Sequence, residues 1–158
     1  MNISTIRREQ LKDGRIESGI LERVQRFTPL AGRAGLSLIF LLSAFGKLSN
    51  LAGTAGYMAS KNMPAVPLFL AGAIAFELLG GLSVLLGYKA RWGAAALIVF
   101  LIPATLIFHN FWAYEGMEQQ MQMINFLKNV AIAGGLMTLI AHGSGPLSLE
   151  RTTVQPQE

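Results

Sequence analysis

Four long apolar stretches dominate the chain, and short polar or charged segments separate them. The stretches run over about residues 30–51, 64–87, 92–112 and 121–142. At about 1.5 Å of rise per residue, a helix of roughly 20 residues crosses the ~30 Å hydrocarbon core of a bilayer. The pattern therefore predicts an all-α integral membrane four-helix bundle with short loops.

The composition supports a membrane protein. Hydrophobic residues make up 52% of the 158 residues and charged residues 14%, against about 25% charged in a typical soluble domain. The chain has no cysteine, which excludes disulfides, thiol catalysis and iron–sulfur ligation by its own residues. No nucleic-acid-binding motif accompanies the net charge of +4. We therefore expect the lipid bilayer as a partner, and no nucleic acid.

Three segments follow from the pattern. Residues 1–28 form a charged, partly amphipathic tail, in which residues 16–27 are expected to make a short helix on the membrane surface. Residues 1–15 are equally compatible with a disordered tail. Residues 29–146 form the four-helix domain, and residues 147–158 form a short polar tail.

The distribution of basic residues predicts the orientation. The N-terminal tail, the turn containing Lys89 and Arg91, and the C-terminal tail hold most of them. The opposite side holds Lys61, together with Lys47 at a helix end. Because cytoplasmic loops are enriched in Lys and Arg, both termini are predicted to be cytoplasmic.

One charge, Glu77, interrupts the second apolar stretch near its middle. A carboxylate at that depth is costly and is by default a candidate functional group. Small residues share its helix face, among them Ala73, Gly80 and Gly81. Such a face allows close helix packing, so Glu77 is expected to point into the bundle and to pair with a basic side chain.

Polar residues from all four helices gather in the same half of the predicted bundle. Glu77 and Lys128 are the candidate catalytic residues, and Lys128 is the expected partner of Glu77, with Lys47 as the second choice. The candidate ligand-binding residues are Lys47, His109, Asn125 and Asn129. Each has a structural alternative: Lys47 as a snorkelling anchor, His109 as an interfacial residue, and Glu77 with Lys128 as a purely structural pair.

Metal and cofactor sites built by the chain itself are not expected. His109 and His142 lie at opposite ends of the predicted bundle, so they are too far apart to share a haem. A single histidine with carboxylates on separate helices is a poor zinc site. The only aspartate, Asp13, lies in the tail, which excludes a Ser–His–Asp triad.

Short motifs occur in a characteristic order along the chain. They are Arg33, Phe45-Gly46-Lys47-Leu48, Phe76-Glu77 with Gly80-Gly81, Leu86-Gly87 with Arg91, His109-Asn110-Phe111-Trp112, Ile124–Asn129, Ala133-Gly134-Gly135 and Gly143–Glu150. This succession resembles the DoxX family of four-helix bacterial and archaeal inner-membrane proteins over about residues 30–151. The resemblance implies a multi-pass protein of the bacterial inner membrane.

The resemblance also implies a link to redox chemistry. The family is named for a subunit of an archaeal thiosulfate:quinone oxidoreductase, and other members are linked to oxidant defence or to resistance against catechol-like compounds. An oxidoreductase role is implied by the resemblance alone, because function depends on sites and not on folds.

Three functions remain open. The first is a subunit of a membrane-bound redox system, with a soluble or membrane redox partner, that binds a quinone or phenolic molecule in a polar cavity in the outer half of the bundle. A quinone is then the candidate cofactor, since the chain carries none of its own. The second is a small-molecule or proton transporter. The third is a non-catalytic membrane anchor for a soluble partner.

Overall fold

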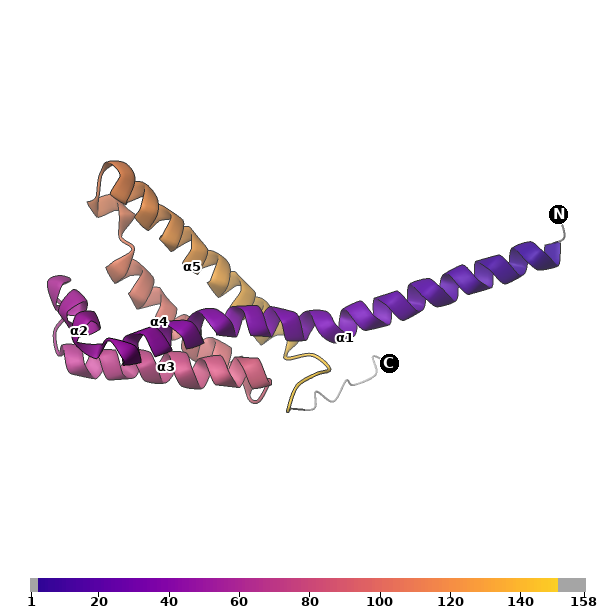
Figure 1. Ribbon diagram of the computed structural model, residues 1–158, viewed down its shortest axis with the longest axis horizontal. Helices are drawn as coiled ribbons and strands as arrows, with labels where there is room; N and C mark the ends of the chain where they lie inside the picture. Colours follow the sequence, from indigo (N-terminus) through magenta and orange to yellow (C-terminus); the bar gives the residue numbers. More distant parts are fainter. Residues whose placement is uncertain (1–2, 151–158) are drawn as a thin grey trace.

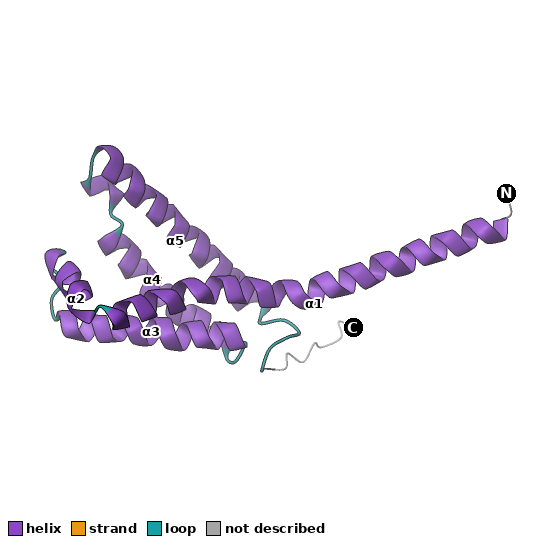
Figure 2. Cartoon of the chain, viewed as in Figure 1, coloured by secondary structure: helices purple, strands orange, loops and turns teal. Residues whose placement is uncertain are grey.

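The computed structural model describes the backbone of residues 3–150 and the side chains of residues 18–150. In this part of the chain the regular structure is helical, with no strand (Figures 1 and 2). Four helical segments are long and apolar enough to cross a membrane: Ser18–Ser49, Val66–Leu86, Ala90–Ala113 and Gly116–His142. The predicted all-α fold with four spans is confirmed.

The helices follow one another in a simple order. They are α1 (Ile3–Ser49), α2 (Leu51–Ser60), α3 (Val66–Leu86), α4 (Ala90–Phe108), the short 3-10 helix η1 (Phe111–Ala113) and α5 (Gly116–His142). We call the end that carries α2 and η1 the α2 end of the bundle. The opposite end, where α3 turns into α4, is the Gly87 end.

The first helix is longer than the pattern predicts. α1 includes the charged tail from Ile3 onward and passes through Pro29 without ending. The tail is thus continuous with the first span, and Figure 1 shows it projecting from the bundle. Its apolar side chains Ile20, Val24 and Phe27 are exposed. Residues 151–158, most of the predicted C-terminal tail, lie outside the described residues.

The segment between the first two spans, where the pattern predicts a loop, contains the short helix α2. α2 begins after Asn50, whose side-chain oxygen accepts a hydrogen bond from the Gly53 N–H at 3.0 Å. This is an N-cap, which satisfies one of the free N–H groups at the start of a helix. Because the segment is short, its helical character was not evident beside the much longer apolar stretches.

The spans pack mainly with their neighbours in sequence. α1 packs on α3, α3 on α4 and α4 on α5, whereas α1 and α5 touch only slightly. Figure 1 shows α5 close to α1 at the Gly87 end and diverging from it toward the α2 end. The main core lies between these helices and consists of Phe40, Val84, Ala90, Ala94, Leu97, Leu101, Ile132, Leu136 and Leu139.

Glycines on two sides of α3 allow its neighbours to approach. A Cβ atom at Gly80 would lie 2.7 Å from the Leu97 Cγ and 3.2 Å from the Gly93 carbonyl oxygen on α4. A Cβ atom at Gly81 would lie 3.0 Å from the Leu41 Cδ2 on α1. The face of small residues predicted around Glu77 is therefore a packing face, as expected for membrane helices.

The Gly87 end is closed by the segment after α5. The Leu149 and Glu150 N–H groups donate to the carbonyls of Leu86 and Gly87, both at 3.0 Å. Arg33 is 2% exposed and donates to the Leu147 carbonyl. The segment after α5 therefore covers Arg33, which lies near the start of the first apolar stretch. The negative end of the α3 dipole at Gly87 favours a cation there.

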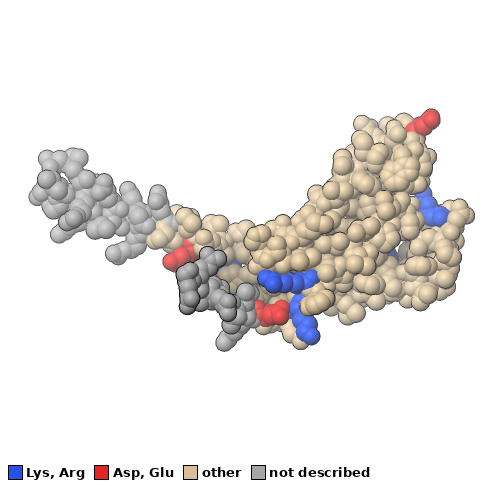
Figure 3. Space-filling model, turned by 180° about the vertical axis from the view of Figure 1, so that it is seen from behind, with Lys and Arg blue, Asp and Glu red and all other residues tan. Residues whose placement is uncertain are grey.

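Charged side chains mark the two ends of the bundle. On the face shown in Figure 3, lysines, arginines and glutamates gather at either end, and an uncharged band lies between them. This distribution fits a bilayer around the middle of the bundle, because charged groups are costly in hydrocarbon.

A pair of glycine substitutions on α3 tests the packing face. We expect Gly80→Leu to lower the melting temperature of the detergent-solubilised protein, because the added side chain has no room against Leu97 and Gly93. Overpacking of this kind costs about 1–3 kcal/mol. Gly72→Leu is the matched control, since nothing lies within 4 Å of a Cβ at Gly72. Equal losses in both variants would contradict the assignment.

Thiol labelling tests the predicted orientation. The chain has no cysteine, so single cysteines can be introduced without background. Glu118→Cys, in the first turn of α5, should react with a membrane-impermeant thiol reagent in intact cells. Tyr88→Cys, in the exposed turn at the Gly87 end, should react only after the membrane is opened. The opposite labelling pattern would reverse the orientation.

Candidate functional site

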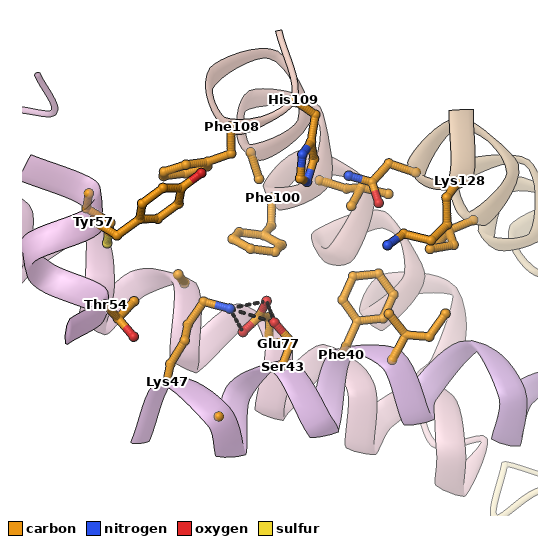
Figure 4. Close-up of a pocket in the computed structure, with 18 residues that line it drawn as sticks. Phe40, Ser43, Lys47, Thr54, Tyr57, Glu77, Phe100, Phe108, His109 and Lys128 are labelled. Carbon is orange, nitrogen blue, oxygen red and sulfur yellow. Dashed lines mark hydrogen bonds and ion pairs between the residues drawn. The ribbon is translucent and has the colours of Figure 1, made fainter. Parts of the chain in front are cut away.

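A cavity opens among the helices toward the α2 end, where α5 diverges from α1 (Figure 4). Its volume is about 470 Å³, which is in the usual range for small-molecule sites. The larger apolar side chains in its wall are Ile39, Phe40, Tyr57, Met58, Phe100, Leu101, Phe108 and Ile132. The polar side chains are Ser43, Lys47, Thr54, Glu77, His109, Lys128 and Asn129. The cavity is thus mostly apolar, with a few polar groups that converge on it.

Glu77 forms a compact ionic cluster with two residues of α1. The Lys47 Nζ lies 2.9 Å from each carboxylate oxygen of Glu77. The Ser43 hydroxyl donates to Glu77 Oε1 at 2.9 Å and accepts from the Lys47 Nζ at 2.6 Å. Ser43 and Lys47 are four residues apart, so both face α3. The Glu77 side chain is 3% exposed and that of Lys47 is 21% exposed.

The expected partner of Glu77 was therefore wrong. The carboxylate pairs with Lys47, the second choice, and not with Lys128. The Lys128 Nζ donates to the Asn125 side-chain oxygen at 2.9 Å. The prediction rested on the similar depths of Glu77 and Lys128 in the membrane, and depth does not show which helices are neighbours. In the structure α1 packs on α3, whereas α5 packs on α4.

The other predicted residues occupy the α4–α5 side. The His109 Nδ1 lies 2.9 Å from the Gln122 Oε1, and the Asn129 amide donates to the Thr105 hydroxyl at 2.9 Å. Both contacts join α4 or its C-terminal end to α5. Asn125 does not line the cavity and reaches it only through Lys128. The structure thus brings Glu77, Lys47, Lys128, His109 and Asn129 around one cavity.

Aromatic side chains in the wall were not predicted. Tyr57 of α2 stacks on Phe108 of α4, with ring centroids 5.5 Å apart, and Figure 4 shows Phe40 and Phe100 on the other sides of the cavity. Phe40 and Phe100 lie in apolar spans where no sequence signal distinguishes them from lipid-facing residues. Tyr57 was missed because residues 52–63 were interpreted as a loop. The N-cap at Asn50 was the available signal for α2.

A polar contact links two loops at the α2 end. The Lys61 ammonium group donates to the Tyr114 hydroxyl and lies over the rings of Tyr57 and Tyr114, at 5.7 and 5.1 Å from their centroids. The hydrogen bond to Tyr114 raises the pKa of Lys61 above its ordinary value, and burial opposes this. The loop after α2 is thereby tied to the loop before α5.

Metal ligands do not cluster in the part of the chain that the structure describes. No group of three or more His, Cys, Asp or Glu side chains there could hold a metal ion. The chemistry available in the cavity is therefore that of one carboxylate, two amines, an imidazole and neutral hydrogen-bonding groups.

The fold and the cavity define a class of protein: a four-span integral membrane protein with a polar cluster inside one half of its bundle. The model of the DoxX family matches residues 28–110, more than half of the chain. The chain belongs to the DoxX family, as its motifs indicated.

Named relatives agree with this assignment. Inner membrane protein YphA of Escherichia coli (strain K12) is 34% identical over 122 residues, which cover 77% of this chain and 87% of that protein. Inner membrane protein YqjF of the same strain is 30% identical over 131 residues, which cover 83% of this chain and 95% of that protein. No solved structure matches the chain. The protein is thus a multi-pass protein of the bacterial inner membrane.

A more distant likeness extends beyond bacteria. The ER-derived vesicles protein ERV29 of Saccharomyces cerevisiae is 24% identical over 129 residues, which cover 82% of this chain and 34% of that protein. The chain is therefore similar to about a third of a longer protein, and we draw no functional conclusion from this likeness.

A double-mutant cycle tests the ionic cluster. Glu77→Gln and Lys47→Met should each destabilise the protein by about 3 kcal/mol, because each leaves a buried charge without its partner. The double variant should recover most of the loss, since replacing both charges removes the unpaired group. Thermal unfolding in detergent measures the three changes.

The same cycle with Lys128 is the control. Glu77→Gln and Lys128→Met should show no coupling, because Lys128 contacts Asn125 and not Glu77. Additive losses for the Lys47 cycle, or strong coupling in the Lys128 cycle, would contradict the pairing seen in the structure.

Proposed function

We propose that this protein binds a quinone or a small phenol in the cavity and serves as the ligand-binding membrane subunit of a redox system. The observation that carries the proposal is a buried carboxylate, Glu77, in the wall of a membrane cavity lined by aromatic rings. Such a cavity offers a flat aromatic ligand both stacking surfaces and a proton-transfer group.

The cavity wall fits a ring of this kind. Phe40 and Phe100 come from α1 and α4, and Tyr57 stacked on Phe108 completes the aromatic part of the wall. Rings in such positions make offset or edge-to-face contacts with an aromatic ligand. The volume of about 470 Å³ accommodates a single substituted ring. The apolar walls thus favour the ring, and the polar groups fix its orientation.

The polar residues can bind the oxygen atoms of the ligand. Lys47 and Lys128 are hydrogen-bond donors on opposite sides of the cavity, and Figure 4 shows His109 above the space between them. Bound quinone would supply the electron-accepting chemistry. Lys47 and Ser43 hold Glu77 beside the cavity, where the carboxylate can accept or release a proton.

A redox partner is part of this proposal. The chain has no cysteine, and its described part has no cluster of metal ligands. Electrons would therefore come from a second protein, or leave to one. The implication of the family resemblance, a subunit and not a complete enzyme, agrees with this arrangement.

Ligand retention tests the proposal. We expect quinone to co-purify with the protein in mild detergent and to be detected by solvent extraction and mass spectrometry. Ala104→Phe should abolish retention, because Ala104 lines the cavity and the added ring fills it. Val99→Phe is the matched control on the same helix, where the side chain is 64% exposed.

Two results would contradict the proposal. One is the absence of quinone from the wild-type protein under conditions in which a known quinone protein keeps its own, combined with no binding of an added short-chain quinone. The other is equal retention by Ala104→Phe and the wild-type protein.

A further inference from the structure

The charges that line the cavity do not balance. Two lysines, Lys47 and Lys128, contribute to its wall, together with one carboxylate, Glu77. Both oxygens of Glu77 lie at 2.9 Å from the Lys47 Nζ, and one also accepts from Ser43. The negative charge of the cavity is thereby offset by Lys47. One positive charge, that of Lys128, remains.

Lys128 has a neutral partner. Its Nζ donates to the Asn125 side-chain oxygen at 2.9 Å, from one turn earlier on α5. Within the described residues no carboxylate forms an ion pair with it. Two other polar residues of the wall bind side chains outside it, since His109 contacts Gln122 and Asn129 contacts Thr105.

The depth of Lys128 makes this charge informative. It lies twelve residues after Gly116, the first residue of α5, and so about 18 Å along a 27-residue helix. That position is near the middle of the helix, and Lys128 is an exposed residue of the cavity wall. Ionisable groups at such depth are costly unless paired, and they mark functional sites.

We propose that Lys128 is the counter-ion for a negatively charged ligand, so that the cavity selects a lipophilic aromatic monoanion such as a phenolate. This inference rests on the proposed function and narrows its ligand class. The anionic oxygen binds the Lys128 ammonium group, and the ring lies between Phe40 and Phe100, which face the same space (Figure 4). The Lys47–Glu77 pair, being neutral overall, lies on the opposite side.

A negative charge on the ligand also accounts for the pairing of Glu77 with a separate lysine, Lys47. Without Lys47, the charge of Glu77 would repel an anion in the same cavity. Because Lys47 offsets the charge of Glu77 and Ser43 also binds this cluster, the remaining charge that sets the electrostatic potential in the cavity is that of Lys128. The arrangement thus separates a structural pair from a recognition charge.

A pair of probes that differ in charge tests the inference. 2,4-Dinitrophenol is ionised at neutral pH, whereas its methyl ether, 2,4-dinitroanisole, has the same ring without the charge. We expect the purified protein in a neutral detergent to bind the phenolate at least about tenfold more tightly than the ether. Equilibrium dialysis measures both dissociation constants.

Variants locate the source of the preference. Lys128→Met should bind both probes with similar affinity, and Lys128→Arg should keep the preference because it keeps the charge. Arg23→Met removes an exposed charge of α1 outside the cavity and should leave both affinities unchanged. A melting temperature of Lys128→Met equal to or above that of the wild-type protein shows that the variant is folded, since it loses a charge without an acidic partner.

The outcomes separate this inference from the proposed function. Equal binding of both probes by the wild-type protein, or a preference that survives Lys128→Met, would overturn the role of Lys128 while ring binding stands. No binding of either probe would overturn both.

The anionic group could also belong to a lipid. Nanodiscs of phosphatidylglycerol and of phosphatidylcholine distinguish the two sources. Binding of the phenolate should be similar in both. If the phenolate failed to bind only in the phosphatidylglycerol nanodiscs, Lys128 would be assigned to a lipid phosphate. That result would overturn the phenolate assignment.

Discussion

The ionic cluster of Glu77, Lys47 and Ser43 is the interaction on which the arrangement of the first two spans depends. A carboxylate inside a bilayer must find its partners within the protein, because lipid offers none. Here both partners lie four residues apart on one face of α1. Their bonds to a single carboxylate fix how α1 is rotated and how it is placed along α3. Close contact is possible because Gly81, one turn further along α3, leaves room for Leu41.

The bundle opens toward the α2 end because the packing faces of α3 are occupied by α1 and α4. Its Glu77 and Gly81 face is occupied by α1, and its Gly80 face is occupied by α4. α5 therefore packs on α4 and meets α1 only at the Gly87 end. At the α2 end no helix fills the space between α1 and α5, and side chains of α1, α2, α3, α4 and α5 line the resulting cavity. The polar cluster that holds α1 to α3 is also part of its wall, so the contact that stabilises the first two spans borders the cavity.

The sequence predicts the parts of this structure that depend on one helix at a time. Span lengths, the small-residue face of α3 and the inward direction of Glu77 follow from hydropathy and helical periodicity. The pairing of Glu77 with Lys47 depends on which helices are neighbours, and residue depth cannot reveal that. The burial of Arg33 could not be predicted for the same reason, because it depends on a distant segment around Leu147. α2 was missed since its cap at Asn50 is a weak signal beside four strong apolar stretches.

The balance of charges around the cavity distinguishes a structural ion pair from a candidate binding residue, which the fold alone does not. A membrane protein can carry a buried ion pair for structural reasons, and Lys47 with Glu77 is consistent with that role. Lys128 has no acidic partner among the described residues, and a negatively charged ligand in the cavity would offset the cost of its charge. Lys128 lies on the wall opposite the pair, near the middle of α5, with a neutral amide as its partner. In the proposed function, the structural role and the binding role are therefore carried by different lysines.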